Sequence, residues 1–270
     1  MTQKTDLAVF TWFGFNYSFD EIVKIIKNAG FQSVMIWWGD DYIEKDKQPK
    51  EKKPDIIRKN NIRLENVHLP IKGVNDIWID SINGEDIINK FIKNIEECGT
   101  YEIPIAVMHI SQGDNPPPYN QLGLDRLKRI IDKAEKVNVN IALENLRKPE
   151  YLDFIFNNIK SDKLGFCYDS GHENCFSPNY NCLTRFGDKL IALHLHDNDG
   201  RNDQHMLPFN GTIIWKKIME QIKNSNYYGP LSLEIANTNN STDIAGYTAE
   251  EYLLEAKNRT YKLIDILKGT

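Results

Sequence analysis

The sequence predicts an α/β protein that folds as one (β/α)8 TIM barrel over residues 1–270. Short apolar runs alternate with longer amphipathic runs along the whole chain, and eight such pairs fill the 270 residues. No linker, low-complexity tract or change of composition divides the chain. Repeated strand–helix pairs imply parallel strands joined by right-handed crossovers. Eight pairs in about 250 residues fit a closed barrel and a single domain.

The expected strands are the short apolar runs. An open doubly wound sheet is the other arrangement of such units, but it usually has a glycine-rich phosphate turn after its first strand. The segment TWFGFNYSFD occupies that place and is not such a turn, so the barrel is favoured. In order, the expected strands are Leu7–Trp12, Ser33–Trp38, Leu64–Leu69, Ile105–Ile110, Asn140–Leu146, Leu164–Asp169, Ile191–Asp197 and Leu231–Ala236.

The expected helices carry apolar residues at every third or fourth position, which is the spacing of one helix face. The first has Ser18 as its N-cap, Glu21 completing a capping box and Gly30 as its C-terminal stop. The same spacing recurs between the later strands and after the last one. Those helical runs cover residues 84–99, 123–137, 212–225 and 249–268.

Composition narrows the function classes. The chain has 33 basic and 38 acidic side chains, a formal charge of −5, and no basic run of the kind that neutralises phosphates, so nucleic acid is an unlikely partner. The four cysteines form no C-x-x-C pair, which favours reduced thiols. The N-terminal segment lacks a secretory apolar region, and no apolar run has the roughly 18 residues of a membrane helix. We therefore expect a cytoplasmic protein without membrane contact, and self-association as a homo-oligomer is left open.

Polar residues that carry chemistry recur where the expected strands end. The C-terminal ends of the strands form one mouth in a (β/α)8 barrel, and active sites lie there. All six histidines of the chain belong to this set. Its members are His68, His109, Glu144, Asp169, His172, His194, His196, Asp203, His205 and Glu234.

Alternation along the strands supports this placement, since successive side chains of a strand point to opposite faces. If the late carboxylates and imidazoles point into the barrel, then Ala142, Cys167, Ala192 and Ser232 also point inward, while bulky residues such as Leu143 and Leu195 face the helices. His194 and His196 share a face but differ in height by roughly 6.6 Å. We expect His196 to reach the mouth and His194 to lie beneath it.

Two glutamates, an aspartate and an imidazole that meet at one mouth carry too much charge to stay unpaired. One divalent cation would balance them, and mixed oxygen and nitrogen donors suit Mn²⁺, Co²⁺, Mg²⁺ or Zn²⁺. The expected ligands are Glu144, Asp169, His196 and Glu234. A buried polar network without an ion is the alternative.

The sequence resembles the xylose-isomerase-like TIM barrels, in particular their sugar isomerase and epimerase group. The resemblance covers nearly the whole chain and is most specific over ALEN (142–145), DSGH (169–172), HLHDNDGRNDQHMLPFNG (194–211) and LEI (233–235). It implies that the same four residues hold a metal, that Glu144 and Glu234 also transfer protons, and that His172 lies close to the substrate. The chain has PFNG (208–211) where relatives often have a Pro-Gly-x-Gly turn.

The same superfamily contains endonuclease IV, which holds three zinc ions. Matching ligand types recur here, so the resemblance also allows additional Zn²⁺ around His68, His109 and His205. The alternative, which we favour, is that these histidines bind substrate hydroxyls. The acidic charge balance disfavours DNA. The matching residues are His68, His109, Glu144, Asp169, His172, His196, Asp203, His205 and Glu234.

Aromatic residues cluster after the first two expected strands. An aromatic ring has a flat apolar face that suits the CH face of a sugar, although packing between helices and barrel is an equally ordinary use. Arg201, Asn145 and Asn198 are candidates to bind hydroxyl groups, or else are simply solvated loop residues. The aromatic set is Trp12, Phe13, Phe15, Trp37 and Trp38, with Trp12 the leading candidate for substrate contact.

These observations predict a metal-dependent isomerase or epimerase that acts on a sugar or sugar phosphate. One glutamate would remove a proton next to a carbonyl, and the other would return it elsewhere. Three alternatives remain: a lyase or dehydratase on a keto-polyol, an endonuclease IV-type zinc phosphodiesterase on abasic DNA, and a barrel that binds a sugar without turnover.

Overall fold

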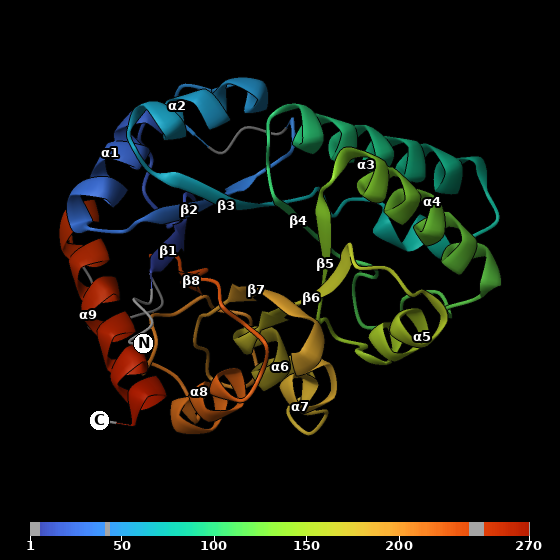
Figure 1. Ribbon diagram of the computed structural model, residues 1–270. Helices are drawn as coiled ribbons and strands as arrows, with labels where there is room; N and C mark the ends of the chain where they lie inside the picture. Colours follow the sequence, from blue (N-terminus) through green and yellow to red (C-terminus); the bar gives the residue numbers. More distant parts are fainter. Residues whose placement is uncertain (1–5, 41–43, 238–245, 270) are drawn as a thin grey trace.

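An eight-stranded parallel barrel forms the centre of the molecule, as predicted (Figure 1). The computed structural model describes residues 6–40, 44–237 and 246–269. The strands pair in the order β7-β6-β5-β4-β3-β2-β1-β8. Their bounds are β1 (Leu7–Phe10), β2 (Ser33–Trp37), β3 (Arg63–His68), β4 (Ile105–Met108), β5 (Asn140–Glu144), β6 (Leu164–Asp169), β7 (Leu190–His194) and β8 (Leu231–Leu233).

The barrel closes between β7 and β8 through a short seam. Leu195 and Leu233 form a single parallel bridge. The backbone N–H of Leu195 donates to the Ser232 carbonyl at 2.9 Å, and the N–H of Glu234 donates to the Leu195 carbonyl at 3.1 Å. Two residues of the candidate site, His194 and Glu234, therefore flank the seam.

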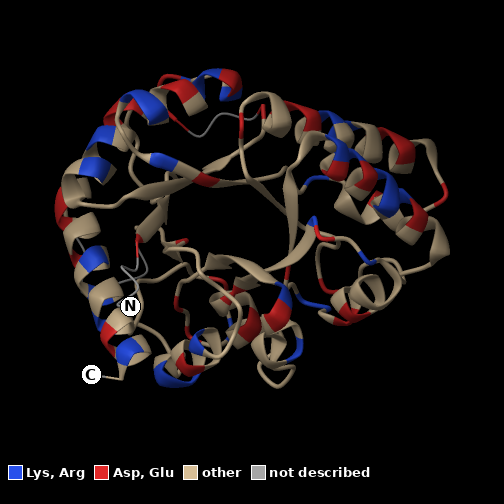
Figure 2. Ribbon diagram, viewed as in Figure 1, with Lys and Arg blue, Asp and Glu red and all other residues tan. Residues whose placement is uncertain are grey.

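Amphipathic helices surround the barrel, and Figure 2 shows that Lys, Arg, Asp and Glu lie chiefly on them. The capping box of α1 forms as expected, with Ser18 and Glu21 bonded reciprocally and Gly30 left-handed. No described helix is long and apolar enough to cross a bilayer. The helices are α1 (Phe19–Ala29), α2 (Lys53–Lys59), α3 (Ile82–Thr100), α4 (Gln121–Val137), α5 (Glu150–Asn158), α6 (Ser170–Phe176), α7 (Cys182–Phe186), α8 (Trp215–Lys223) and α9 (Ala249–Lys268), with 3-10 turns η1 (Lys50–Lys52), η2 (Val74–Trp78) and η3 (Gly187–Lys189).

The barrel interior has the predicted alternation. Ala142, Cys167 and Ala192 pack together with Val107 in a small cluster of their own. The bulky neighbours along the same strands, such as Leu143 and Leu195, belong instead to the large core between barrel and helices. Small residues inside leave room in the narrow lumen for polar side chains at the mouth.

The floor of the lumen holds a polar pair that the sequence did not reveal. Ser232 on β8 donates to the carboxylate of Glu65 on β3, with Oγ–Oε distances of 2.7 and 2.9 Å. Both side chains are buried. Burial raises the pKa of Glu65 to about 7, against smaller lowering contributions from Ser232 and His194.

The end of β7 differs from the expectation. The strand stops at His194, not at Asp197. Leu195 then makes the seam bridge, and Asp197 pairs antiparallel with Met206 from its own following loop. The chain thus leaves the barrel ladder at Leu195, because its next backbone partner is local rather than a neighbouring strand. This changes which histidine stands at the strand end.

Candidate metal centre and active site

Glu144 lies at the centre of the polar cluster, at the end of β5, and is fully buried. Its Oε2 lies 3.2 Å from Nε2 of both His68 and His109, and 3.5 Å from Nδ1 of His194. Its Oε1 lies 3.0 Å from Nδ1 of His172. Strands β3, β5 and β7 and helix α6 each supply one of these side chains, and His109 directly follows β4. The mouth of the barrel therefore gathers four imidazoles around one carboxylate.

A four-residue ligand group, here called the quartet, consists of Glu144, Asp169, His194 and Glu234. One ligand atom of each lies within 4.8 Å of the ligand atoms of the others. Nδ1 of His194 is 2.9 Å from Oε2 of Glu234, whose side chain is 14% exposed. Three members are fully buried, so Glu234 is the member that solvent reaches.

The quartet contains His194 where the sequence predicted His196. The prediction placed His194 beneath the ligands, on the assumption that the strand continued to Asp197. In the register between β6 and β7, His194 lies directly opposite Asp169, which ends β6. His196 instead forms a second group with His205 and Glu234, again with ligand atoms within 4.8 Å of one another.

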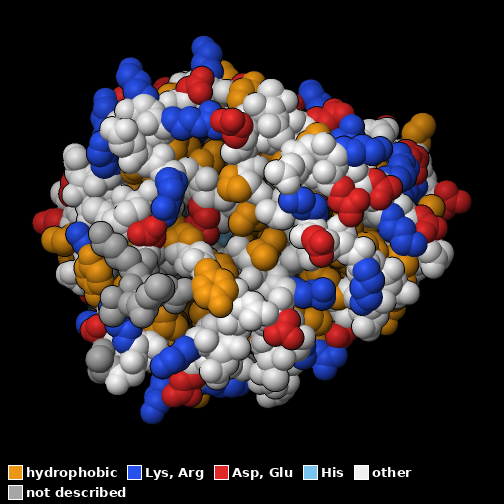
Figure 3. Space-filling view, in the orientation of Figure 1, with side chains coloured by type: hydrophobic (Ala, Val, Ile, Leu, Met, Phe, Trp, Pro, Cys, Tyr) orange, Lys and Arg blue, Asp and Glu red, His pale blue; other side chains and the backbone are white. Residues whose placement is uncertain are grey.

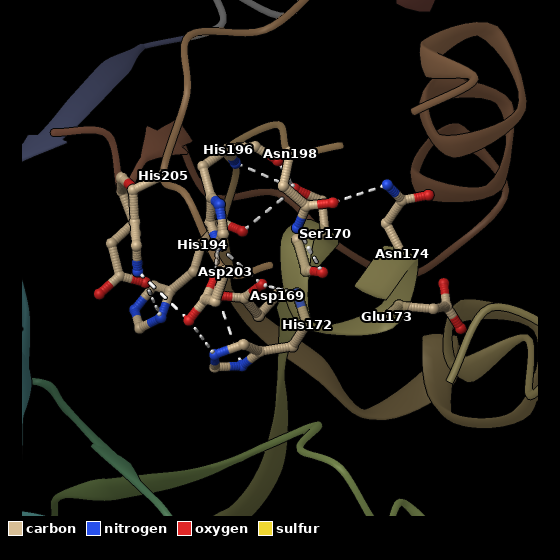
Figure 4. A network of polar contacts seen from close by, with 12 residues as sticks. Asp169, Ser170, His172, Glu173, Asn174, His194, His196, Asn198, Asp203 and His205 are labelled. Carbon is tan, nitrogen blue, oxygen red and sulfur yellow. Dashed lines mark hydrogen bonds and ion pairs between the residues drawn. The ribbon is translucent and has the colours of Figure 1, made fainter. Parts of the chain in front are cut away.

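The second group lies beside the quartet and is partly carried by the loop between β7 and α8 (Figure 4). The rings of His196 and His205 stack with centroids 4.1 Å apart. Nε2 of His196 is 3.0 Å from Oδ1 of Asp169. Asp203 from the same loop lies 3.3 Å from Nε2 of His172 and 3.5 Å from Nε2 of His205. The predicted residues His172, His196, Asp203 and His205 therefore all reach the site.

A third group is formed by His68, His109 and Glu144. The rings of His68 and His109 meet edge to face at 4.9 Å between centroids. Glu144 belongs to this group and to the quartet, while Glu234 belongs to the quartet and to the second group. The three groups thus form one continuous array of ligand atoms.

The donor atoms of this array fit a divalent cation. Both oxygens of Glu144, both ring nitrogens of His194, Nε2 of His109 and Nδ1 of His196 are buried and make no hydrogen bond within the described residues. Among them, Oε2 of Glu144 lies at ion-pair distance from Nε2 of His109 and Nδ1 of His194. Buried polar atoms normally have partners, and an ion bound among them would supply one. Carboxylate and imidazole donors suit Mn²⁺, Co²⁺, Mg²⁺ or Zn²⁺.

The charged groups of the site shift one another's pKa values, and these shifts bear on the binding of a cation. Burial opposes ionisation of Glu144, but His109 and His194 outweigh it and hold the pKa of that carboxyl well below its usual range. Burial likewise opposes the charge on His172, yet Asp169, Asp203 and Glu144 raise its pKa well above the usual value. The pKa of His194 is likewise raised by Cys167, Glu234 and Glu144 against burial, whereas burial lowers the pKa of His109. His172 and His194 thus hold protons where a cation would bind, so metal binding should release protons.

The other predicted contact residues divide into two sets. Trp12 is 41% exposed and meets the His205 ring edge to face at 6.4 Å, and Trp37 stacks on His68 at 5.4 Å. Arg201 is an exposed loop residue whose N–H donates to Asp199. The remaining aromatics, Phe13, Phe15 and Trp38, pack in or against the core.

Asn145 and Asn198 do not serve as free hydroxyl binders, because their amides are already bonded to backbone. Asn145 donates to the Asp169 carbonyl and accepts from the Asp169 N–H, both at 2.8 Å. Asn198 donates to the Gly171 carbonyl at 2.8 Å. Both are fully buried and hold the start of α6 in place.

Sequence reasoning missed two residues that shape the site. Ser170 accepts from the His196 N–H at 2.9 Å and donates to the His196 carbonyl at 2.7 Å, which fixes the backbone of that histidine. Asp197 is fully buried and accepts four N–H groups. Both residues lie inside the motifs DSGH and HLHDND, which could have drawn attention to them. From the sequence alone, however, each resembles an ordinary loop residue.

Residues 23–258 match the family described as Xylose isomerase-like TIM barrel. The chain belongs to this family. The match covers most of the chain and agrees with the barrel geometry and with the resemblance seen in the sequence. It leaves the individual reaction open.

Similar proteins extend this picture without fixing the reaction. The chain is 35% identical over 160 residues to the uncharacterized protein y4fM of Sinorhizobium fredii, which covers 54% of this chain and 51% of that one. The chain spans about half the length of the curated relatives it matches.

Two solved structures share the fold over nearly the whole length. A D-tagatose 3-epimerase-like protein superposes with a TM-score of 0.73 at 20% identity, covering 98% of both chains. The IolI protein, solved with a zinc atom, superposes with a TM-score of 0.77 at 20% identity, covering 96% of this chain and 98% of that one.

Proposed function

We propose that this protein is a metal-dependent isomerase or epimerase that acts on a sugar or sugar phosphate. The observation that carries the proposal is the quartet, in which three carboxylates and an imidazole converge at the barrel mouth. A divalent cation held there would polarise the substrate carbonyl and stabilise negative charge that develops on its oxygen. The epimerase-like protein and IolI support this proposal as fold relatives.

The two glutamates would transfer the proton. Glu144 ends β5 and Glu234 follows β8, so they come from separate strands. One would take a proton from the carbon next to the carbonyl, and the other would return one to a neighbouring atom or the opposite face. Glu234 is the partly exposed member of the pair, so it is the one that an entering substrate meets first.

We assign the histidine ligand to His194 and keep His196 as a neighbour of the metal site. His194 lies in the quartet and His196 in the second group. His172, His205 and Asp203 would then bind substrate hydroxyls. Trp12 and Trp37 flank His205 and His68, and their ring faces are suited to the apolar side of a sugar.

The test follows solvent deuterium into the carbon next to the carbonyl across a panel of keto-sugars and their phosphates. The metal-loaded enzyme should catalyse exchange, and Glu144→Gln and Glu234→Gln should abolish it at saturating metal. Glu220→Gln on the exposed side of α8 is the matched control. Interconversion of sugars without exchange would replace proton transfer by a hydride shift. Binding without turnover or exchange would contradict the enzymatic proposal.

A second candidate is a zinc phosphodiesterase of the endonuclease IV type. The second and third ligand groups favour it, because together with the quartet they offer places for more than one ion. The formal charge of −5 disfavours it, and acidic and basic side chains are interspersed on the face in Figure 3. Three ions per chain with cleavage of abasic DNA would make this the preferred function. Loss of water from a keto-polyol would instead identify a lyase.

A further inference from the structure

We propose that Asp197 is a positioning residue, which holds the β7–α8 loop (residues 198–214) so that Asp203 and His205 face the quartet. The assignment rests on the proposed function only in its activity measurement, because the placement of the loop can be observed without substrate.

The carboxylate of Asp197 collects N–H groups from both ends of the loop. Oδ1 accepts from the backbone N–H of Asn198 at 2.9 Å and of Ile213 at 3.2 Å. Oδ2 accepts from the backbone N–H of Phe209 at 3.0 Å and from Nε1 of Trp215 at 2.9 Å. Asp197 itself is fully buried. Four donors from three parts of the loop and from the start of α8 thus meet at one buried side chain, which fixes the loop.

The backbone of Asp197 holds the middle of the same loop. Its N–H donates to the Met206 carbonyl at 2.8 Å, and the Met206 N–H donates back at 2.9 Å. Gly211 passes so close that an added Cβ would lie 2.3 Å from Oδ1 of Asp197 and 2.1 Å from the Asn198 carbonyl. The loop therefore folds tightly around one side chain.

The loop held by Asp197 carries Asp203 and His205, which face the site. His205 immediately precedes Met206 and adopts a left-handed backbone with φ 48°. That conformation is disfavoured for residues with a side chain and persists only where the surroundings hold it. Here the His205 Nδ1 pairs with the Glu234 carbonyl at 2.7 Å, and Asp203 reaches His172 and His205.

Substitution by asparagine tests the acceptor role with little change of shape. Whichever way the new amide turns, its NH2 faces one of the two donor pairs, so two N–H groups lose their acceptor. The quartet stands on strand ends, and no hydrogen bond joins Asp197 to its members among the described residues. The loss should therefore fall on the loop and on the histidines that its residues contact.

The experiment labels the six histidines with carbon-13 at Cε1 and compares their NMR resonances in the metal-free protein. Asp197→Asn should displace or broaden the resonances of His172, His196 and His205, while those of His68 and His109 stay in place. Single His→Gln variants assign the peaks. Asp199→Asn is the matched control, since Asp199 is an exposed carboxylate in the same loop that accepts from the Arg201 and Asn202 N–H groups.

Trp215→Phe provides a second variant, in case Asp197→Asn fails to fold. It removes one of the four donors and keeps an aromatic ring in the core. It should move the same three resonances by a smaller amount. Six unchanged resonances, or equal displacement of all six, in a folded variant would overturn the proposal.

Activity and metal binding complete the test. Calorimetric titration with Co²⁺ should show binding at the quartet within about threefold of wild type, because no hydrogen bond joins Asp197 to a quartet residue among the described residues. If the enzyme turns over a sugar, Asp197→Asn combined with His205→Ala should match His205→Ala alone within twofold in kcat/KM. Full additivity would show that Asp197 does not act through His205. If no sugar is turned over, the proposed function fails while the NMR result still decides the role of Asp197.

Discussion

The two sides of the site are held in place by different means. Glu144, Asp169 and His194 stand at the ends of neighbouring strands, where Glu144 pairs with Cys167 and Asp169 pairs with His194 in the backbone ladders. Asp203 and His205 stand in the loop between β7 and α8, which folds around Asp197. Side chains on strands are placed more precisely than side chains on loops. The comparison suggests that the strand side fixes the chemistry, whereas the loop side adjusts what binds beside it.

The strongest test of this division changes the strand side at Glu144. Glu144→Gln should lower kcat by about 10²- to 10⁴-fold at saturating metal, because it removes an acid–base group and a ligand together. Metal affinity, measured by calorimetry, should fall as well. Glu220→Gln should behave as wild type. A kcat for Glu144→Gln within tenfold of wild type would place the chemistry elsewhere.

A second test addresses the floor beneath the strand side. Burial raises the pKa of Glu65 from 4.5 to about 7. Between these values the folded protein holds a proton that the unfolded chain has released, so stability should fall as pH rises through this window. The loss is at most about 3 kcal/mol. Above pH 7 it is complete.

Glu65→Gln should remove this pH dependence. Urea denaturation of the metal-free protein at pH 5 and pH 8 measures it, and the difference between variant and wild type isolates Glu65 from the other titrating groups. The variant should gain stability relative to wild type on going to pH 8. An equal change in the two proteins would mean that Glu65 is ionised over the whole range.

The loop side should give a smaller effect. His205→Ala or Asp203→Asn should lower kcat/KM by about 10- to 100-fold, the range typical of groups that orient a metal site or its substrate. Metal stoichiometry at the quartet should stay unchanged. If an ion is lost per chain, His205 is a ligand and not a substrate contact, and the phosphodiesterase candidate gains support.

The smallest effect is expected at Phe209, which has φ 72°, in the left-handed region that favours glycine. Phe209→Gly relieves a left-handed conformation that costs about 1–2 kcal/mol. It also increases the freedom of the unfolded chain, which costs about 0.5–1 kcal/mol, and it removes the contact with the Trp215 ring. Thermal unfolding should show a net change below about 1 kcal/mol. A large loss would show that the Phe209 ring, and not its backbone N–H, anchors the loop.

The sequence was sufficient for the fold because the periodicity of each segment is local information. The alternation that sends Ala142 and Cys167 inward and Leu143 outward is visible without any partner. The ends of the strands are harder to predict from the sequence, since a strand stops where its neighbour stops pairing. β1 and β8, for example, end at Phe10 and Leu233, before the predicted Trp12 and Ala236.

Strand pairing, which the sequence does not show, also explains why His196, and not His194, was predicted among the ligands. The rule of alternation correctly places His194 and His196 on one side, but it cannot say which of them stands level with Asp169. That depends on the register between β6 and β7, which shifts between Phe166 and Cys167 and places Asp169 opposite His194. Likewise, the sequence shows that Asn145 is polar but not that the backbone of Asp169 occupies its amide.

The narrow seam between β7 and β8 indicates where local unfolding of the barrel should be easiest. Other neighbouring strands share between two and five paired positions, whereas the seam has the single Leu195–Leu233 bridge. Amide protons at this junction should exchange with deuterated water before those of β5 or β6. A cation bound by His194 at the end of β7 and by Glu234 after β8 would link these two strands across the seam. Loading the site should therefore slow that exchange locally.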